Sequence, residues 1–269
     1  PIRGAAARAE SALHRMLGRW RADTLDTPFF EFLVPLLAAE LARDGLRLPV
    51  PDLDLMSQRR IEKLARLPLP LLYDGRSNLV HALEAMSEQL DFHQVAQLRA
   101  PYGGYGYSPS ATAAVLLHGP TWDASAASWL RDLSANTPGA VPGALPASHP
   151  ADTFEAAWVL HALSHGGLSL QPATTPALRA LLRWLAGSLT PDGASFARQH
   201  AMPCDADDTA MVLVVLNRLG VRMPLEPLLT FEADDHFVSY VGERTASSSA
   251  NAHVLEALCS MGAETRLAR

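Results

Sequence analysis

The chain has 269 residues and a net charge of −6, with 48% hydrophobic and 19% charged residues. This composition is typical of a globular protein with a sizeable core, and it excludes an intrinsically disordered chain. The acidic balance argues against nucleic acid as a partner, and no apolar run is long enough to span a bilayer.

Apolar residues recur at helical spacing along the whole chain, which opens inside one such pattern. The other expected helices cover residues 29–45, 78–90, 110–119, 153–167, 177–189, 208–220 and 251–262. Most of these segments end at glycine, and their connections are rich in Pro, Gly and Asp. No convincing alternating strand pattern occurs. We therefore predict an all-α protein of helical hairpins packed around barrels.

The segment 136–150, rich in Pro and Gly, is the best linker candidate. We expect two helical domains, residues 1–148 and 149–269. The first residue is Pro1 rather than Met, which suggests a portion of a longer protein. Two cysteines are too few for a disulfide framework and fit a reducing compartment, so we expect a cytoplasmic location.

The sequence "CDADDTAMVLVVLNRLG" places Asp205, Asp207 and Asp208 at the start of an apolar helix. Three interpretations are open. The carboxylates can cap the helix and meet the positive end of its dipole. They can share a divalent cation. Alternatively, burial and mutual repulsion can raise the pKa of one carboxyl, so that it carries a proton near neutral pH.

The segment "DADDTA" resembles the DxDD motif of the class II terpene cyclases. Further segments resemble the same family in the same order: "FFEFLVPLLAAELARDGLRLPVPD", "KLARLP", "NLVHALEAM", "YSPSATAAVLLH", "VPGALPASHPADTFEAAWVL" and "FEADDHFVSYVGERTASSSANAHVLEAL". The resemblance covers nearly the whole chain, and it is strongest to bacterial diterpene cyclases of the copalyl diphosphate synthase type. It implies two α-barrel domains, called γ and β, with the active site between them. Because family members are roughly twice this length, both domains are expected to be incomplete here.

The resemblance also implies a chemistry. Such enzymes protonate the terminal alkene of an isoprenoid diphosphate, cyclise the resulting cation and retain the diphosphate. Asp207, the middle aspartate, is the expected acid, and Asp205 and Asp208 would set its geometry and pKa. Asn251 matches an asparagine that hydrogen-bonds the acid in the family; without the family it reads as a helix N-cap. The expected substrate is geranylgeranyl diphosphate, with farnesyl diphosphate as the alternative.

His81 matches a histidine that, in plant-type members, works with an asparagine to hold a water as terminal base. Gly143 stands where that asparagine is expected, so the pair is incomplete. We expect His81 and a backbone carbonyl of residues 141–144 to hold the water on the side of the cavity opposite Asp207. A histidine on an apolar helix can equally be a core residue with its hydrogen bonds satisfied.

The resemblance assigns the diphosphate to Lys63 and a Mg²⁺ ion to an acidic segment that offers Asp23, Asp26 and Glu31. Oxygen ligands of this kind suit Mg²⁺. Lys63 can also be a solvated helix lysine. The DDxxD motif of ionisation-initiated cyclases is not present in the sequence, so loss of the diphosphate is not expected.

Aromatic faces stabilise cations, and Tyr107, Trp158 and Phe237 are candidates to line the cavity. Each can instead be an ordinary core residue. Composition alone also allows a non-catalytic helical scaffold that binds a lipid or a protein, and a homodimer is compatible with either function.

Overall fold

The computed structural model describes residues 2–17, 30–75, 77–137, 144–166, 175–198, 203–243 and 246–263. These residues form helices joined by turns and isolated β-bridges, and the described part contains no extended strand. The predicted all-α class is confirmed. No helix among the described residues has the length and apolar character needed to cross a membrane.

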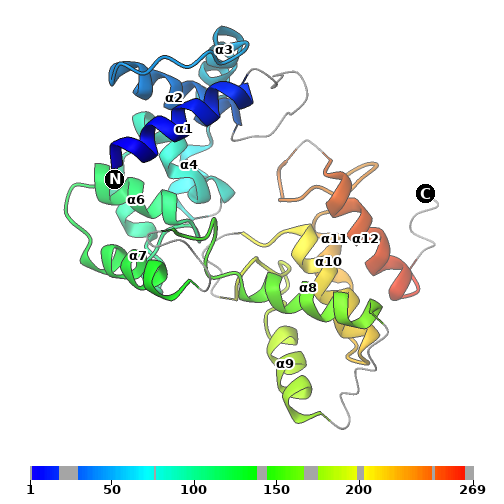
Figure 1. Cartoon of the computed structure of the whole chain (residues 1–269). Helices are drawn as coiled ribbons and strands as arrows, with labels where there is room; N and C mark the ends of the chain where they lie inside the picture. The colour runs from blue at the N-terminus through cyan, green and yellow to red at the C-terminus, as the bar shows by residue number, and fades with distance from the viewer. Residues whose placement is uncertain are drawn as a thin grey trace.

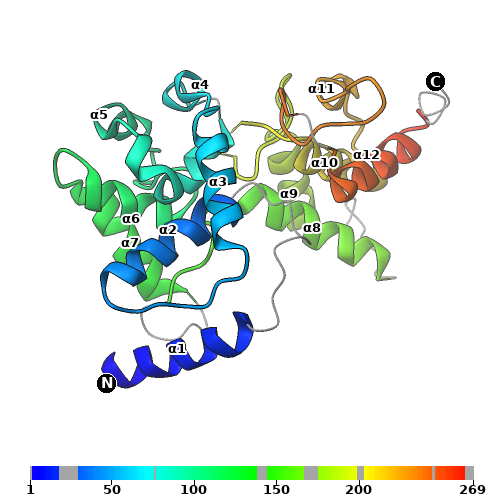
Figure 2. The same cartoon turned by 90° about the horizontal axis from the view of Figure 1, so that it is seen from above.

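The N-terminal helices gather on one side of the molecule (Figures 1 and 2). They are α1 (Ile2–Leu17), α2 (Phe30–Arg43), α3 (Leu53–Leu64), α4 (Leu69–Tyr73), the 3₁₀ helix η2 (Asn78–Gln89), α5 (Phe92–Val95), η3 (Ala96–Leu98), α6 (Pro109–His118) and α7 (Ala124–Asn136). Their core includes Phe32, Leu83, Met86 and Tyr105, all buried. The second group follows α7 and has separate cores.

The C-terminal helices are α8 (Asp152–His165), α9 (Pro176–Ala186), α10 (Ala206–Arg218), α11 (Glu226–Leu229) and α12 (Ser248–Ser260). In Figure 1, α10 lies between α8 and α12. One core joins α8 and α9 to one face of α10, and a second joins α11 and α12 to its other face. A helix apolar on all sides is expected in such a central position.

The burial of α10 explains how the chain tolerates carboxylates at its start. Every side chain of residues 211–216 is at most 1% exposed. Full burial of an aliphatic side chain contributes roughly 1.5–3 kcal/mol. Burial of these six side chains stabilises α10 and, with it, the position of the carboxyl groups in its first turn.

The segment expected as the helix 78–90 is a 3₁₀ helix with a kink at Ala82. Gly106 explains how this segment is placed. A Cβ at Gly106 would lie 2.3 Å from the carbonyl oxygen of Val80, and its φ of +56° also favours glycine. The backbones of Val80 and Gly106 can therefore approach closely, which brings the adjacent His81 against the loop before α6.

Candidate active site

Asp205 is the N-cap of α10, and Asp207 and Asp208 lie in its first turn. The Asp205 carboxylate accepts a hydrogen bond of 2.8 Å from the backbone N–H of Asp208. The Thr209 hydroxyl accepts a bond of 2.8 Å from the N–H of Ala194 and donates one of 2.5 Å to the carbonyl of Asp205. The capping interpretation is confirmed for Asp205, and the loop before α10 is fixed to the helix start.

Asp205 and Asp208 are almost fully buried, at 6% and 3% exposure. Burial raises the pKa of Asp205 to about 6 against the lowering effect of its hydrogen bonds with Asp208. Burial, followed by the negative charge of Asp205 and a hydrogen bond with it, raises the pKa of Asp208 well above its usual range. Among the described atoms, Asp208 Oδ1 has no hydrogen-bond partner. Of Asp205 and Asp208, Asp208 is therefore the residue whose neutral form is favoured more strongly by burial and by the nearby negative charge.

Asp207 differs from both neighbours, because its side chain is 33% exposed. Its Oδ1 lies 2.6 Å from Nδ1 of His253, which α12 contributes. The His253 ring meets the Trp158 ring of α8 edge to face, with centroids 5.6 Å apart. Three helices thus bring an acid, an imidazole and an indole together. His253 was not among the residues expected from the sequence to contact the acid, although it lies in the segment "NAHVLEAL" that carries part of the resemblance.

The expected hydrogen bond between Asn251 and Asp207 is absent from the described hydrogen bonds, and that geometric prediction is wrong. The Asn251 side chain accepts from the N–H of Phe237 at 2.9 Å and donates to its carbonyl at 2.8 Å. A further bond of 2.9 Å goes to the carbonyl of Ser247. The alternative N-cap interpretation is also wrong, since Ser247 caps α12. Asn251 fixes the loop that carries Phe237 to the first turn of α12.

His81 is half-buried, and both ring nitrogens have partners. Nδ1 lies 2.7 Å from the carbonyl oxygen of Gly106, and Nε2 lies 3.3 Å from the hydroxyl of Ser148. A carbonyl can only accept, so Nδ1 carries a hydrogen. In neutral His81 the Nε2 atom is then a free base that accepts from Ser148. Gly143 lies outside the described residues.

Glu31 and Lys63 form an ion pair, and Arg59 also binds Glu31 at 2.9 Å. The Glu31 carboxylate is buried, and two cationic side chains pair with its single negative charge. This single, doubly paired carboxylate does not fit a Mg²⁺ site by itself. Asp23 and Asp26, the other expected ligands, lie outside the described residues.

The three candidate aromatic residues have different environments. Trp158 contacts His253 and also stacks on Phe154 at 4.2 Å. Tyr107 is fully buried, and its hydroxyl donates to the carbonyl of Ala197 at 3.1 Å, which joins the two groups of helices. Phe237 is held by its backbone to Asn251. Trp158 alone of these three has a described contact with the partner of Asp207.

Two further ionisable groups, Tyr240 and Cys204, lie near the carboxyl groups of Asp205 and Asp208. Burial, followed by the charges of Asp205 and Asp208, raises the pKa of the Tyr240 hydroxyl, so it stays protonated. Burial raises the pKa of the Cys204 thiol to about 11, and the charge of the adjacent Asp205 adds to this effect. The other cysteine, Cys259, is exposed on α12, and both are free thiols. The carboxyl groups of Asp205 and Asp208 thus have a neutral hydroxyl and a neutral thiol in their surroundings.

Comparison with solved structures shows that the chain has the all-α fold of terpene cyclase domains. The ent-copalyl diphosphate synthase from Streptomyces platensis superimposes with a TM-score of 0.69 and 32% identity, over 98% of this chain and 51% of that one. The Arabidopsis thaliana ent-copalyl diphosphate synthase superimposes with a TM-score of 0.74 at 24% identity, over 89% of this chain and 34% of that one. No protein-family profile matches the chain.

Curated proteins with similar sequences have names of diterpene synthases. Phyllocladan-16-alpha-ol synthase from Phomopsis amygdali is 34% identical over 93% of this chain, and copalyl diphosphate synthase from Talaromyces verruculosus is 31% identical over 93%. The chain spans 25% and 26%, respectively, of the length of these relatives. The similarity therefore concerns one part of much longer proteins.

Proposed function

We propose that the chain carries the acid site of a class II cyclase, which converts geranylgeranyl diphosphate to a copalyl-type bicyclic diphosphate with the diphosphate retained. The observation that carries the proposal is the pair Asp207–His253 at the start of a buried helix, beside two buried carboxyl groups of raised pKa. The similarity to copalyl diphosphate synthases supports the same chemistry.

Asp207 would act as the proton donor. With a hydrogen on Nδ1, His253 would donate to Oδ1 of Asp207, and Oδ2 would carry the acidic hydrogen toward an alkene. The edge contact with Trp158 restrains the imidazole plane. Asp205 would hold the first turn of α10, and with it Asp207, in place through its bond from the N–H of Asp208. His253 would thus take the orienting role that the sequence analysis gave to Asn251.

The overall reaction would be an isomerisation. A proton from Asp207 adds to the terminal alkene, the cation closes the rings, and a proton leaves a neighbouring carbon at the end. His81 Nε2, with the Ser148 hydroxyl beside it, is our candidate for the terminal base. Water must be kept from the cation until that step.

Incubation of the protein with geranylgeranyl diphosphate or farnesyl diphosphate, each with Mg²⁺ or with EDTA, tests the proposal. After dephosphorylation, mass spectrometry should detect a bicyclic C20 alcohol that Asp207→Asn does not form. Asp234→Asn, which changes an exposed aspartate of the same region, is the control. A C15 product alone would favour a drimenyl-type reaction. A product of unchanged amount from folded Asp207→Asn would reject the acid assignment, and no product from either substrate would favour a binding scaffold.

A further inference from the structure

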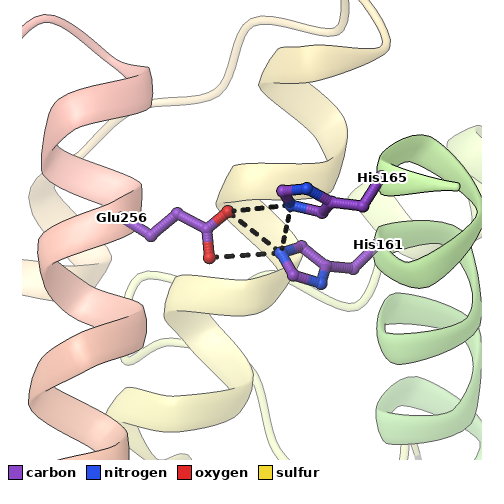
Figure 3. Close-up of side chains that lie close together, drawn as sticks. All are labelled: His161, His165 and Glu256. Carbon is purple, nitrogen blue, oxygen red and sulfur yellow. Dashed lines mark hydrogen bonds and ion pairs between the residues drawn. The ribbon is translucent and has the colours of Figure 1, made fainter. Parts of the chain in front are cut away.

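A second cluster of ionisable side chains lies between α8 and α12, apart from Asp207. His161 and His165 are one turn apart on α8 and face Glu256 of α12 (Figure 3). His161 Nε2 lies 2.9 and 3.1 Å from the two Glu256 oxygens, and His165 Nε2 lies 3.5 Å from Oε1. The two Nε2 atoms are 3.2 Å apart. One ligand atom from each residue lies within 4.8 Å of the others.

The arrangement of nitrogen and oxygen atoms in this cluster suits a cation. The carboxylate can only accept hydrogen bonds, and two imidazole nitrogens at this separation can share only one hydrogen between them. Both histidines nevertheless turn the same ring nitrogen toward Glu256 (Figure 3). Three potential ligand atoms from two helices thus converge on one point, as the ligands of a bound metal ion do.

Arg218, in the last turn of α10, provides the competing interaction. Its Nη2 donates to Glu256 Oε1 at 2.6 Å, and its Nη1 contacts His165 Nε2. Arg218 therefore contacts two of the three side chains of the cluster. The Arg218 side chain is 31% exposed, so the guanidinium can turn to solvent when a metal ion enters.

We propose that His161, His165 and Glu256 bind a divalent transition-metal ion, with Zn²⁺ as the preferred ion. Two imidazoles and one carboxylate are an established ligand set for zinc, which leaves a fourth position for solvent. The His165 side chain is 54% exposed and provides an entry route. The ion would join α8 to α12 one helical turn from the contact between Trp158 and His253. The proposal does not depend on the cyclase function.

Calorimetric titration of tag-free, EDTA-treated protein with ZnCl₂ is the direct test. The expected result is one equivalent of Zn²⁺ per chain, with affinity at least about 10-fold weaker in His161→Ala and His165→Ala. His14→Ala, which changes an exposed histidine on α1, should bind as the unmodified protein does. Arg218→Met should bind more tightly, because the competing guanidinium is removed. Saturating Zn²⁺ should raise the Tm of the unmodified protein and not that of His165→Ala.

Unchanged affinity in a folded His165→Ala variant would overturn the proposal, as would the absence of Zn²⁺ binding in Arg218→Met. Anomalous scattering at the zinc absorption edge, from crystals of the unmodified protein grown with ZnCl₂, needs no variant. A peak bounded by His161, His165 and Glu256 supports the site. A peak confined to other residues rejects it and leaves the cluster as an ion-pair network.

Discussion

Asn251 and His253 lie two residues apart on α12, yet they bind different parts of the protein. Successive residues of an α-helix are about 100° apart around its axis, so residues i and i+2 point about 200° apart. Asn251 holds the backbone of Phe237, whereas His253 reaches Asp207. The structure thus separates a residue that fixes a loop from one that contacts the proposed acid.

The contact between His253 and Asp207 predicts a defined effect on turnover. His253→Ala should lower kcat by roughly 100-fold with a small change in KM, in line with the usual contribution of a positioned acid. His253→Asn should recover part of this activity, because an amide N–H can still donate to Asp207. Steady-state kinetics over a range of pH measures both variants, with His14→Ala as control. Equal rates for His253→Ala and the unmodified protein would show that the contact does not orient the acid.

Asn251→Ala should mainly lower stability. The change leaves the N–H and carbonyl of Phe237 without their described side-chain partner, at a cost of about 1–3 kcal/mol in the free energy of unfolding. Urea denaturation measures this change. Asn136→Ala, which removes an exposed asparagine on α7 with a local bond, should cost much less. If folded Asn251→Ala loses turnover while its stability is unchanged, the original catalytic assignment of Asn251 is restored.

The buried carboxyl groups predict a pH-dependent stability. An aspartate in the unfolded chain has a pKa near 3.9, whereas Asp205 in the folded chain has a pKa of about 6 and that of Asp208 is also raised. Between these values the folded state binds more protons than the unfolded state. The two groups therefore contribute most stability below about pH 4, and this contribution is lost as the pH rises through about 6.

Asp208→Asn removes the ionisation and preserves the shape of the neutral carboxyl. The Tm of Asp208→Asn minus that of the unmodified protein should increase from pH 4 to pH 8. Thermal denaturation at several pH values measures this difference, and Asp234→Asn should show no such trend. A difference that is constant with pH would mean that Asp208 ionises normally in the folded protein.

His81→Ala should change the product rather than the initial protonation. If Nε2 of His81 removes the final proton, its loss should redirect the cation toward a hydroxylated or rearranged diphosphate. Ser148→Ala should alter the product ratio less, because the hydroxyl only contacts that nitrogen. Product analysis by mass spectrometry distinguishes the cases. An identical product profile from folded His81→Ala would move the search for the base elsewhere.

The proposed role of Lys63 in binding the diphosphate can be tested by comparison with Arg59, since both side chains pair with the Glu31 carboxylate. If Lys63 binds the diphosphate, Lys63→Met should raise KM at least about 10-fold, whereas Arg59→Met should leave KM nearly unchanged. Kinetics with the diphosphate substrate measures the difference. If both variants lower stability alike and neither changes KM, Lys63 serves only as a partner of Glu31.

The helical class could be predicted because apolar periodicity reports burial on one side of a helix, as in α9, where the buried Leu178, Leu182 and Leu185 share one face. The same periodicity did not reveal that η2 is a kinked 3₁₀ helix, because that form depends on the close approach of Val80 and Gly106. Sequence also placed Asp205 and Asp207 at a helix start. The sequence did not show whether Asn251 or His253 contacts Asp207, since that contact depends on how α12 is rotated against α10. His161 and Glu256 are 95 residues apart, and tertiary packing alone brings them together.

The environments of the two thiols make selective chemical labelling possible. A thiol reacts with maleimide or iodoacetamide as the thiolate, and the raised pKa of Cys204 keeps that form scarce at neutral pH. Cys259 is exposed and lies one turn beyond Glu256 on α12. A fluorophore can therefore be attached at Cys259 without mutating Cys204. Such a single label would report optically on the region between α8 and α12.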